Sequence, residues 1–92
     1  MERRVATAGE LLQRITVNSK ILGGKPTIRG HRLAVEQVLG MLAAGDRPET
    51  ILEGYPWLEP EDLQACLVYA YRIVAHERVD LTLDRAADRR GP

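Results

Sequence analysis

The stretch VEQVLGMLAAGDRPETILEGYPWLEPEDL, residues 35–63, decides the fold class, because the apolar residues here repeat every three to four positions. One face of the first predicted helix, over residues 35–44, carries Val35, Val38, Leu39 and Leu42. Gly45 follows as a typical helix stop. The pattern therefore predicts a helical domain.

Two more helices follow in the same stretch and beyond it. Asp46 is expected to be the N-cap of a short helix over residues 47–54, with Glu49 three positions on. That helix must end before Pro56, which cannot continue the hydrogen-bond ladder. Pro60 then opens the longest predicted helix, residues 60–78. This helix is apolar on more than one face, which favours a homodimer.

Upstream of residue 35 the pattern predicts short strands over residues 14–17, 27–28 and 32–34, the last two forming a small hairpin around Gly30. Residues 1–10 show no periodicity and are expected to be a flexible lead-in. A single domain is expected over residues 11–79, followed by a charged tail, 80–92. The predicted fold is mainly α, a three-helix helix-turn-helix-like or winged-helix-like domain with a small N-terminal β-hairpin or short strands.

Composition limits the classes of function. The chain has 92 residues, 45% of them hydrophobic, and no apolar run long enough to cross a membrane is visible. The charged N-terminus lacks the features of a signal peptide, so a cytoplasmic location is expected. Cys66, the single cysteine, excludes an internal disulfide framework and is interpreted as a small buried hydrophobe.

The net charge of zero hides an uneven distribution. Residues 11–35 carry no acid and five bases, namely Arg14, Lys20, Lys25, Arg29 and Arg32. Residues 36–62 carry Arg47 against seven acids, namely Glu36, Asp46, Glu49, Glu53, Glu59, Glu61 and Asp62. Such polarity can steer a partner or join two copies of the chain.

The glycine-rich segment GGKPTIRG, residues 23–30, was compared with a phosphate-binding P-loop. The P-loop pattern would need a glycine at Ser19 and a hydroxyl at Pro26, and it would lose an amide at that proline. The segment is therefore interpreted as a rigid turn that uses Gly23, Gly24, Pro26 and Gly30. It is expected to display a nucleic-acid-binding or partner-binding surface made of Lys25, Arg29, His31 and Arg32.

No catalytic, metal or cofactor site is predicted. His31 and His76 are not spaced with a carboxylate in a ligand pattern. Glu59, Glu61 and Asp62 surround a helix N-terminus, where the helix dipole favours negative charge. In a helix-turn-helix these acids would lie at the major groove, so any DNA contact would depend on the basic turn.

Residues 15–72 resemble the domain-of-unknown-function 433 family of small prokaryotic proteins. The resemblance rests on the Gly-Gly-Lys-Pro turn, the Ile-x-Gly-x-Arg stretch, the Ala-Gly before the second helix, the Tyr-Pro-x-Leu turn and the Glu-Asp-Leu start of the last helix. It places Tyr55 and Pro56 in a structural turn. The resemblance also implies a helix-turn-helix-like, homeodomain-like fold similar to VapB-type antitoxins, which are commonly paired with a PIN-like ribonuclease toxin.

The leading hypothesis is therefore a non-enzymatic antitoxin-like or transcription-regulatory homodimer that binds operator DNA, a PIN-like toxin, or both. Arg85, Arg89 and Arg90 of the tail are the candidate toxin-binding residues, since arginine pairs with clustered carboxylates. The alternative is a homo-oligomeric protein-interaction module without a nucleic-acid role, in which the basic turn of one copy meets the acidic region of another. The absence of a basic excess favours this alternative.

Overall fold

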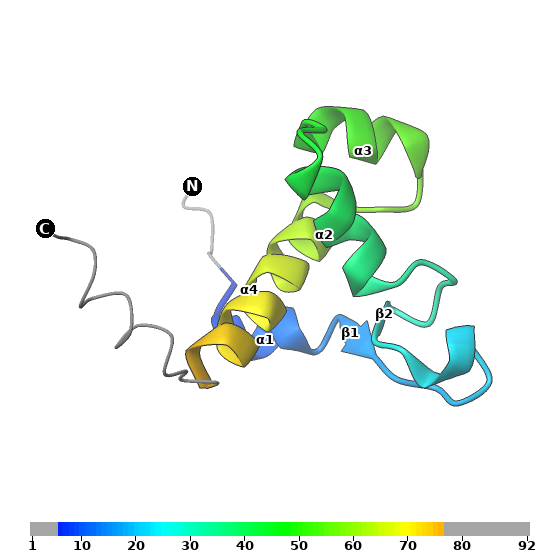
Figure 1. Cartoon of the computed structure of the whole chain (residues 1–92), viewed down its shortest axis with the longest axis vertical. Helices are drawn as coiled ribbons and strands as arrows, with labels where there is room; N and C mark the ends of the chain where they lie inside the picture. The colour runs from blue at the N-terminus through cyan, green and yellow to red at the C-terminus, as the bar shows by residue number, and fades with distance from the viewer. Residues whose placement is uncertain (1–5, 77–92) are drawn as a thin grey trace, which may run out of the picture.

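The computed structural model describes residues 6–76 of the chain, and they form a mainly helical domain with a two-stranded antiparallel sheet (Figure 1). In chain order the elements are α1 (Ala8–Leu12), β1 (Ile15–Thr16), the 3-10 turn η1 (Leu22–Gly24), β2 (Thr27–Ile28), α2 (Val35–Ala43), α3 (Pro48–Gly54) and α4 (Pro60–His76). The three helices predicted downstream of residue 34 are present, and the end predicted for the last one, 77–78, lies outside the described residues.

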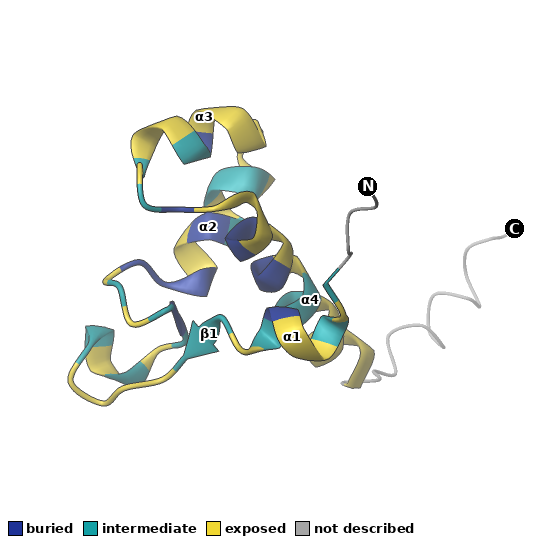
Figure 2. Ribbon diagram, turned by 180° about the vertical axis from the view of Figure 1, so that it is seen from behind, coloured by how far each residue is buried: buried dark blue, intermediate teal, exposed yellow. Residues whose placement is uncertain are grey.

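Helix α4 is the central element of the domain, since α1, β1, α2 and α3 all contact it. The core gathers residues from the sheet, the loop after it and all three later helices, namely Ile28, Leu33, Val35, Val38, Ile51, Leu58, Leu63 and Cys66. Helix α3 is exposed along most of its length (Figure 2). Cys66 is buried as expected.

Helix α2 ends in a glycine motif. Gly45 has φ of +100°, its N–H donates to the Leu42 carbonyl oxygen, and the Asp46 N–H donates to that of Met41. This is the Schellman pattern, which satisfies two carbonyls that the helix end leaves open. It also corrects the prediction of Asp46 as N-cap of α3. Asp46 belongs to the end of α2, and the N-cap is Arg47, which makes no side-chain capping bond.

The N-terminal part differs from the prediction in two ways. Residues 8–12 are helical, not a lead-in without structure, because Thr7 and Glu10 form a reciprocal capping box and Leu11 is buried. The Thr-x-x-Glu spacing before two leucines is visible in the sequence and was missed. Residues 32–34 are not a strand either. They supply only one bridge, between Thr27 and Ala34, since α2 begins at the next residue.

The sheet pairs β1 with β2, with Ile15 opposite Ile28 and Thr16 opposite Thr27. The predicted strand over residues 14–17 is thus shortened to Ile15–Thr16. After β2 the chain reverses through Arg29 and Gly30, whose φ values are +45° and +75°, and the His31 N–H donates to the Ile28 carbonyl oxygen. Positive φ at both central positions is the feature of a type I′ turn. The left-handed backbone expected at Gly30 is therefore present.

A second left-handed segment precedes β2. Leu22, Gly23 and Gly24 have φ values of +47°, +64° and +86°. The two glycines adopt this conformation without strain, whereas at Leu22 the Cβ atom makes it unfavourable. The segment turns the chain back so that β2 pairs with β1. None of the helices in residues 6–76 combines the length and the apolarity that a membrane crossing needs.

Candidate functional site

The most connected polar group in the described residues is the carboxylate of Asp62, on the first turn of α4. Its side chain is fully buried. Arg29, from the turn after β2, binds it with two N–H groups: Nε donates to Oδ1 at 2.9 Å and Nη2 to Oδ2 at 2.6 Å. The same Nη2 donates to the Trp57 carbonyl oxygen at 3.0 Å. This two-point geometry is the strongest form of arginine–carboxylate pairing.

Two further donors complete the cluster around Asp62. Arg14 Nη1 donates to Oδ1 at 2.9 Å and to Glu59 Oε1 at 2.7 Å. The Glu59 N–H donates to Oδ2 at 2.8 Å, so Asp62 also caps the start of α4. We call Arg14, Arg29, Glu59 and Asp62 the arginine clamp. It joins the turn between α1 and β1, the turn after β2 and the start of α4.

The clamp shifts the pKa values of its members. Burial alone would raise the pKa of Asp62, but the hydrogen bonds from Arg29, the Glu59 N–H and Arg14 outweigh it and hold that pKa below its ordinary value. The pKa of Arg14 is raised, first by its hydrogen bond to Glu59 and then by that to Asp62. The pKa of Arg29 is raised by its hydrogen bond to Asp62. All three groups therefore stay charged at neutral pH.

The lowered pKa of Asp62 predicts an acid-dependent loss of stability. The unfolded chain takes up a proton at Asp62 at about pH 3.9, whereas the folded state holds its carboxylate charged to lower pH. Its contribution to the free energy of unfolding is thus fully present above that pH and is lost as the pH falls through the folded pKa. Urea unfolding between pH 6 and pH 2 measures this slope, which should be shallower in Asp62→Asn. Equal slopes would show that Asp62 does not titrate differently on folding.

The four residues predicted to form a nucleic-acid or partner surface do not form one exposed set. Arg29 is in the clamp, and Lys25 Nζ lies 2.8 Å from Glu36 Oε2 in an exposed ion pair. The His31 ring stacks on the Trp57 indole with a centroid distance of 3.7 Å and an interplanar angle of 5°. Arg32 is exposed, and no ion pair to it occurs within residues 6–76. The structure thus engages three of the four in contacts within the domain.

The Tyr55–Pro56 turn also supports the clamp. The Leu58 N–H donates to the Tyr55 carbonyl oxygen at 2.8 Å, which closes the turn between α3 and α4. Trp57 projects from this turn, and its ring lies edge-on to Tyr55 and 5.6 Å from the Arg29 guanidinium carbon. Both aromatic side chains pack against the core. The turn therefore holds the carbonyl and the ring against which Arg29 is placed.

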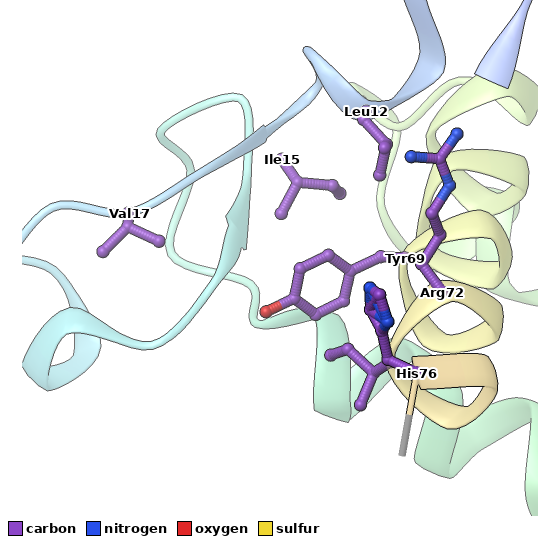
Figure 3. Close-up of a pocket in the computed structure, with 7 residues that line it drawn as sticks. Leu12, Ile15, Val17, Tyr69, Arg72 and His76 are labelled. Atoms are coloured by element: carbon purple, nitrogen blue, oxygen red, sulfur yellow. The ribbon is translucent and has the colours of Figure 1, made fainter. Parts of the chain in front are cut away.

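A different surface is hollowed. A cavity of about 520 Å³ lies between the α1–β1 segment and the C-terminal half of α4 (Figure 3). The Tyr69 ring points from α4 across it toward Ile15. Its lining is Leu12, Ile15, Val17, Tyr69, Arg72, Ile73 and His76. We call it the α4 groove. It is mostly apolar, with Arg72 and His76 as its two basic side chains. The sequence did not predict it, since it depends on how α1 packs on α4.

The chemistry available in the described part of the chain is limited. Burial raises the pKa of the Cys66 thiol to about 12, so the side chain is an uncharged thiol at neutral pH. Residues 6–76 contain no group of three or more His, Cys, Asp or Glu side chains arranged to hold a metal ion. The predicted tail residues Arg85, Arg89 and Arg90 lie outside the described residues.

Comparison with known proteins gives the family. A family described as a protein of unknown function, DUF433, matches residues 15–70, which include the sheet, the core and every residue of the arginine clamp except Arg14. The chain belongs to the DUF433 family. An uncharacterised protein, y4eO, of Sinorhizobium fredii (strain NBRC 101917 / NGR234) is 39% identical over 56 residues. Those residues are 61% of this chain and 25% of that relative, so the chain spans about a quarter of its length. No solved structure matches.

Arg29 and Asp62 both lie inside the matched DUF433 segment, and Arg14 lies just before it. Arg29 was predicted to lie on an exposed surface, and the only role predicted for Asp62 was interaction with the helix dipole. The hydrogen-bonded ion pair between Arg29 and Asp62 was not predicted. The uneven charge distribution could have indicated such a contact. The basic segment 11–35 and the acidic segment 36–62 belong to one small domain, so their charges can pair within the chain. The structure pairs them within the chain.

Proposed function

We propose that this DUF433 protein is a non-enzymatic antitoxin-like or regulatory protein, active in the cytoplasm, that works by binding another protein. The single observation behind the proposal is the α4 groove, an open apolar cavity with a basic rim. Exposed apolar surface of this kind is typical of protein-binding sites. The partner proposed from the family resemblance is a PIN-like ribonuclease toxin, whose clustered carboxylates complement Arg72 and the three arginines of the tail.

The groove and the tail are neighbours in sequence. His76 lines the groove and is the last residue that the structure describes, and the tail with Arg85, Arg89 and Arg90 begins four positions later, at residue 80. A partner seated in the groove would bury apolar side chains there, and we propose that its acidic groups bind the tail arginines. The groove would supply affinity, and the arginines would supply recognition of acidic groups.

Operator DNA is a weaker candidate partner. In a helix-turn-helix interpretation, α2 and α3 or α3 and α4 would form the motif. The exposed residues of α3 include Glu49 and Glu53, and the first turn of α4 exposes Glu61, so DNA phosphates would repel either helix. Lys25 and Arg29 are already neutralised by carboxylates of the same domain. These observations favour a protein partner.

Growth rescue tests the proposal. The chain is co-expressed with a PIN-like ribonuclease toxin, whose toxicity is scored by colony counts. We expect the wild-type chain to restore growth and Ile73→Glu to fail, because a charge in the groove opposes burial of an apolar partner. Glu53→Gln, on the exposed face of α3, is the matched control and should restore growth. Lack of rescue by the wild-type chain would overturn the antitoxin role, and rescue by Ile73→Glu would overturn the groove as its site.

The second candidate function is a homo-oligomeric interaction module. It is favoured by a different surface, the outer face of α4, where large apolar side chains are exposed. The sequence predicted that the basic turn of one copy would contact the acidic region of another. In the structure, however, Arg29 of that turn and Asp62 of that region are paired with each other in the arginine clamp. A homodimer would have to use other residues.

A further inference from the structure

The α4 groove contains apolar side chains that the described elements leave open to solvent. Ile73, from α4, and Val17, just after β1, both line it and are 47% and 67% exposed. Every residue from 71 to 76 is exposed, so the end of α4 is not buried by any element within residues 6–76. Apolar surface that a small domain leaves open in this way is typical of a docking site.

One wall of the groove is the β1 segment, from which Ile15 and Val17 project (Figure 3). Antiparallel strands alternate between residue pairs that exchange main-chain hydrogen bonds and pairs that do not. The Ile15–Ile28 pair is of the second kind, because the N–H and C=O of Ile28 bond to Leu33 and His31 on the side away from β1. The N–H and C=O of Ile15 therefore point away from β2, and neither bonds to a residue between 6 and 76. Such a free edge can pair with an extended segment.

The chain carries a segment of matching pattern shortly after α4. Residues 79–83 read Val-Asp-Leu-Thr-Leu, in which apolar and polar residues alternate strictly. In an extended segment of this sequence, Val79, Leu81 and Leu83 share one face. The segment lies outside the described residues, so its pattern is taken from the sequence alone.

The connection from α4 is long enough for this segment to reach back over the groove. His76, at the end of α4, lines the groove, and Val79 follows three residues later, a reach of about 10 Å. The groove residues Tyr69 and His76 are seven positions apart on the helix, a rise of about 10 Å. Five extended residues span about 13 Å, so residues 79–83 can cover that length.

The charges of the segment complement those of the groove. Arg72 and His76 are the basic side chains of the groove, and neither forms an ion pair with a residue between 6 and 76. Asp80 and Asp84 lie on the polar face of the segment and at its end. Opposite charges at the edge of a contact favour association and help to select the partner.

We propose that residues 79–83 dock in the α4 groove of their own chain, extended along the free edge of β1, with the three apolar side chains facing Tyr69 and Ile73. The chain's own segment is favoured over a separate molecule, because its attachment next to the groove gives it a high effective concentration there. The segment then competes with the protein partner of the proposed function. As a regulation of that function the inference rests on it, but the docking itself involves this chain alone.

Amide hydrogen exchange of the full chain, followed by NMR at 50 µM and 500 µM, tests the docking. A strand along β1 protects the Ile15 N–H, whereas Leu81→Glu places a charge against the apolar groove and displaces the segment. We expect the Ile15 amide to exchange about tenfold faster in Leu81→Glu than in the wild-type chain. Thr82→Glu is the matched control, because it adds a charge on the opposite face of the segment and should leave the rate unchanged. The amide of Cys66, in the buried part of α4, shows that each variant is folded.

Three outcomes would overturn the proposal. Equal exchange of the Ile15 amide in wild type and Leu81→Glu would show that the segment does not cover β1. Loss of protection in Thr82→Glu as well would show that the apolar face of the segment is not what binds. Protection that is stronger at 500 µM than at 50 µM would assign the groove to the segment of another copy. No toxin is present in the sample, so failure here is distinguishable from failure of growth rescue.

Discussion

Replacing Asp62 with alanine is expected to lower the free energy of unfolding by about 3 kcal/mol, because it leaves two arginines and the Glu59 N–H without their shared acceptor. This is the low end of the range for breaking a buried ion pair. The side chains of Arg14 and Arg29 are 28% and 32% exposed, so water can partly rehydrate them. Urea unfolding at pH 7 measures the change.

The matched control is Glu61→Ala, which removes an exposed carboxylate from the same helical turn. It should change the free energy of unfolding by less than about 0.5 kcal/mol when measured at a concentration where the chain is monomeric. A second comparison is Arg29→Ala, which removes the two-point contact but leaves Arg14 on Asp62. If Asp62→Ala proved no more destabilising than Glu61→Ala, the clamp would have no structural role.

Replacing Ile28 with alanine is expected to lower the free energy of unfolding by about 3 kcal/mol, because the side chain is fully buried in the core shared with α2 and α4. The residue comes from a strand of only two residues, which cannot be stable alone. The effect would show that the sheet and the helices unfold together. Thermal unfolding followed by circular dichroism and by Trp57 fluorescence measures it.

Val17→Ala is the control for Ile28, since it removes an aliphatic side chain just after β1 that is largely exposed. It should leave the midpoint of unfolding nearly unchanged. Coincident transitions from the two probes are expected for one cooperative domain. A Trp57 transition that precedes the loss of helix would instead mean that the turn and sheet form a separate unit.

The helices could be predicted from the sequence because their signals are local. The spacing of Val35, Val38 and Leu42 defines α2, and Gly45 marks its end with the left-handed backbone that glycine permits. Family membership was likewise recognisable from the turn motifs. The error at Asp46 is also local in origin. Asp46 fits both the C-terminal motif of α2 and the N-cap of α3. In the structure its N–H makes a hydrogen bond of the Schellman motif, so it belongs to the end of α2.

The arginine clamp could not be predicted in the same way, because Arg14 and Arg29 lie 48 and 33 positions before Asp62. Sequence periodicity carries no information about pairing over such separations. The sequence around a basic residue in a glycine-rich turn does not show whether its side chain faces solvent or a buried carboxylate. The α4 groove was missed for a related reason, since it depends on the packing of α1, the helix that the sequence interpretation left out.

We propose that the basic turn serves the domain's own structure and that the protein acts on a protein partner. Fluorescence anisotropy with DNA from the region upstream of its coding sequence, across a salt series from 50 to 200 mM, is the first test. We expect no measurable binding at 50 mM salt for the wild-type chain, and none for Arg32→Ala. Tight binding that falls steeply with salt, and less steeply in Arg32→Ala, would show that the turn neutralises phosphates and would overturn this proposal.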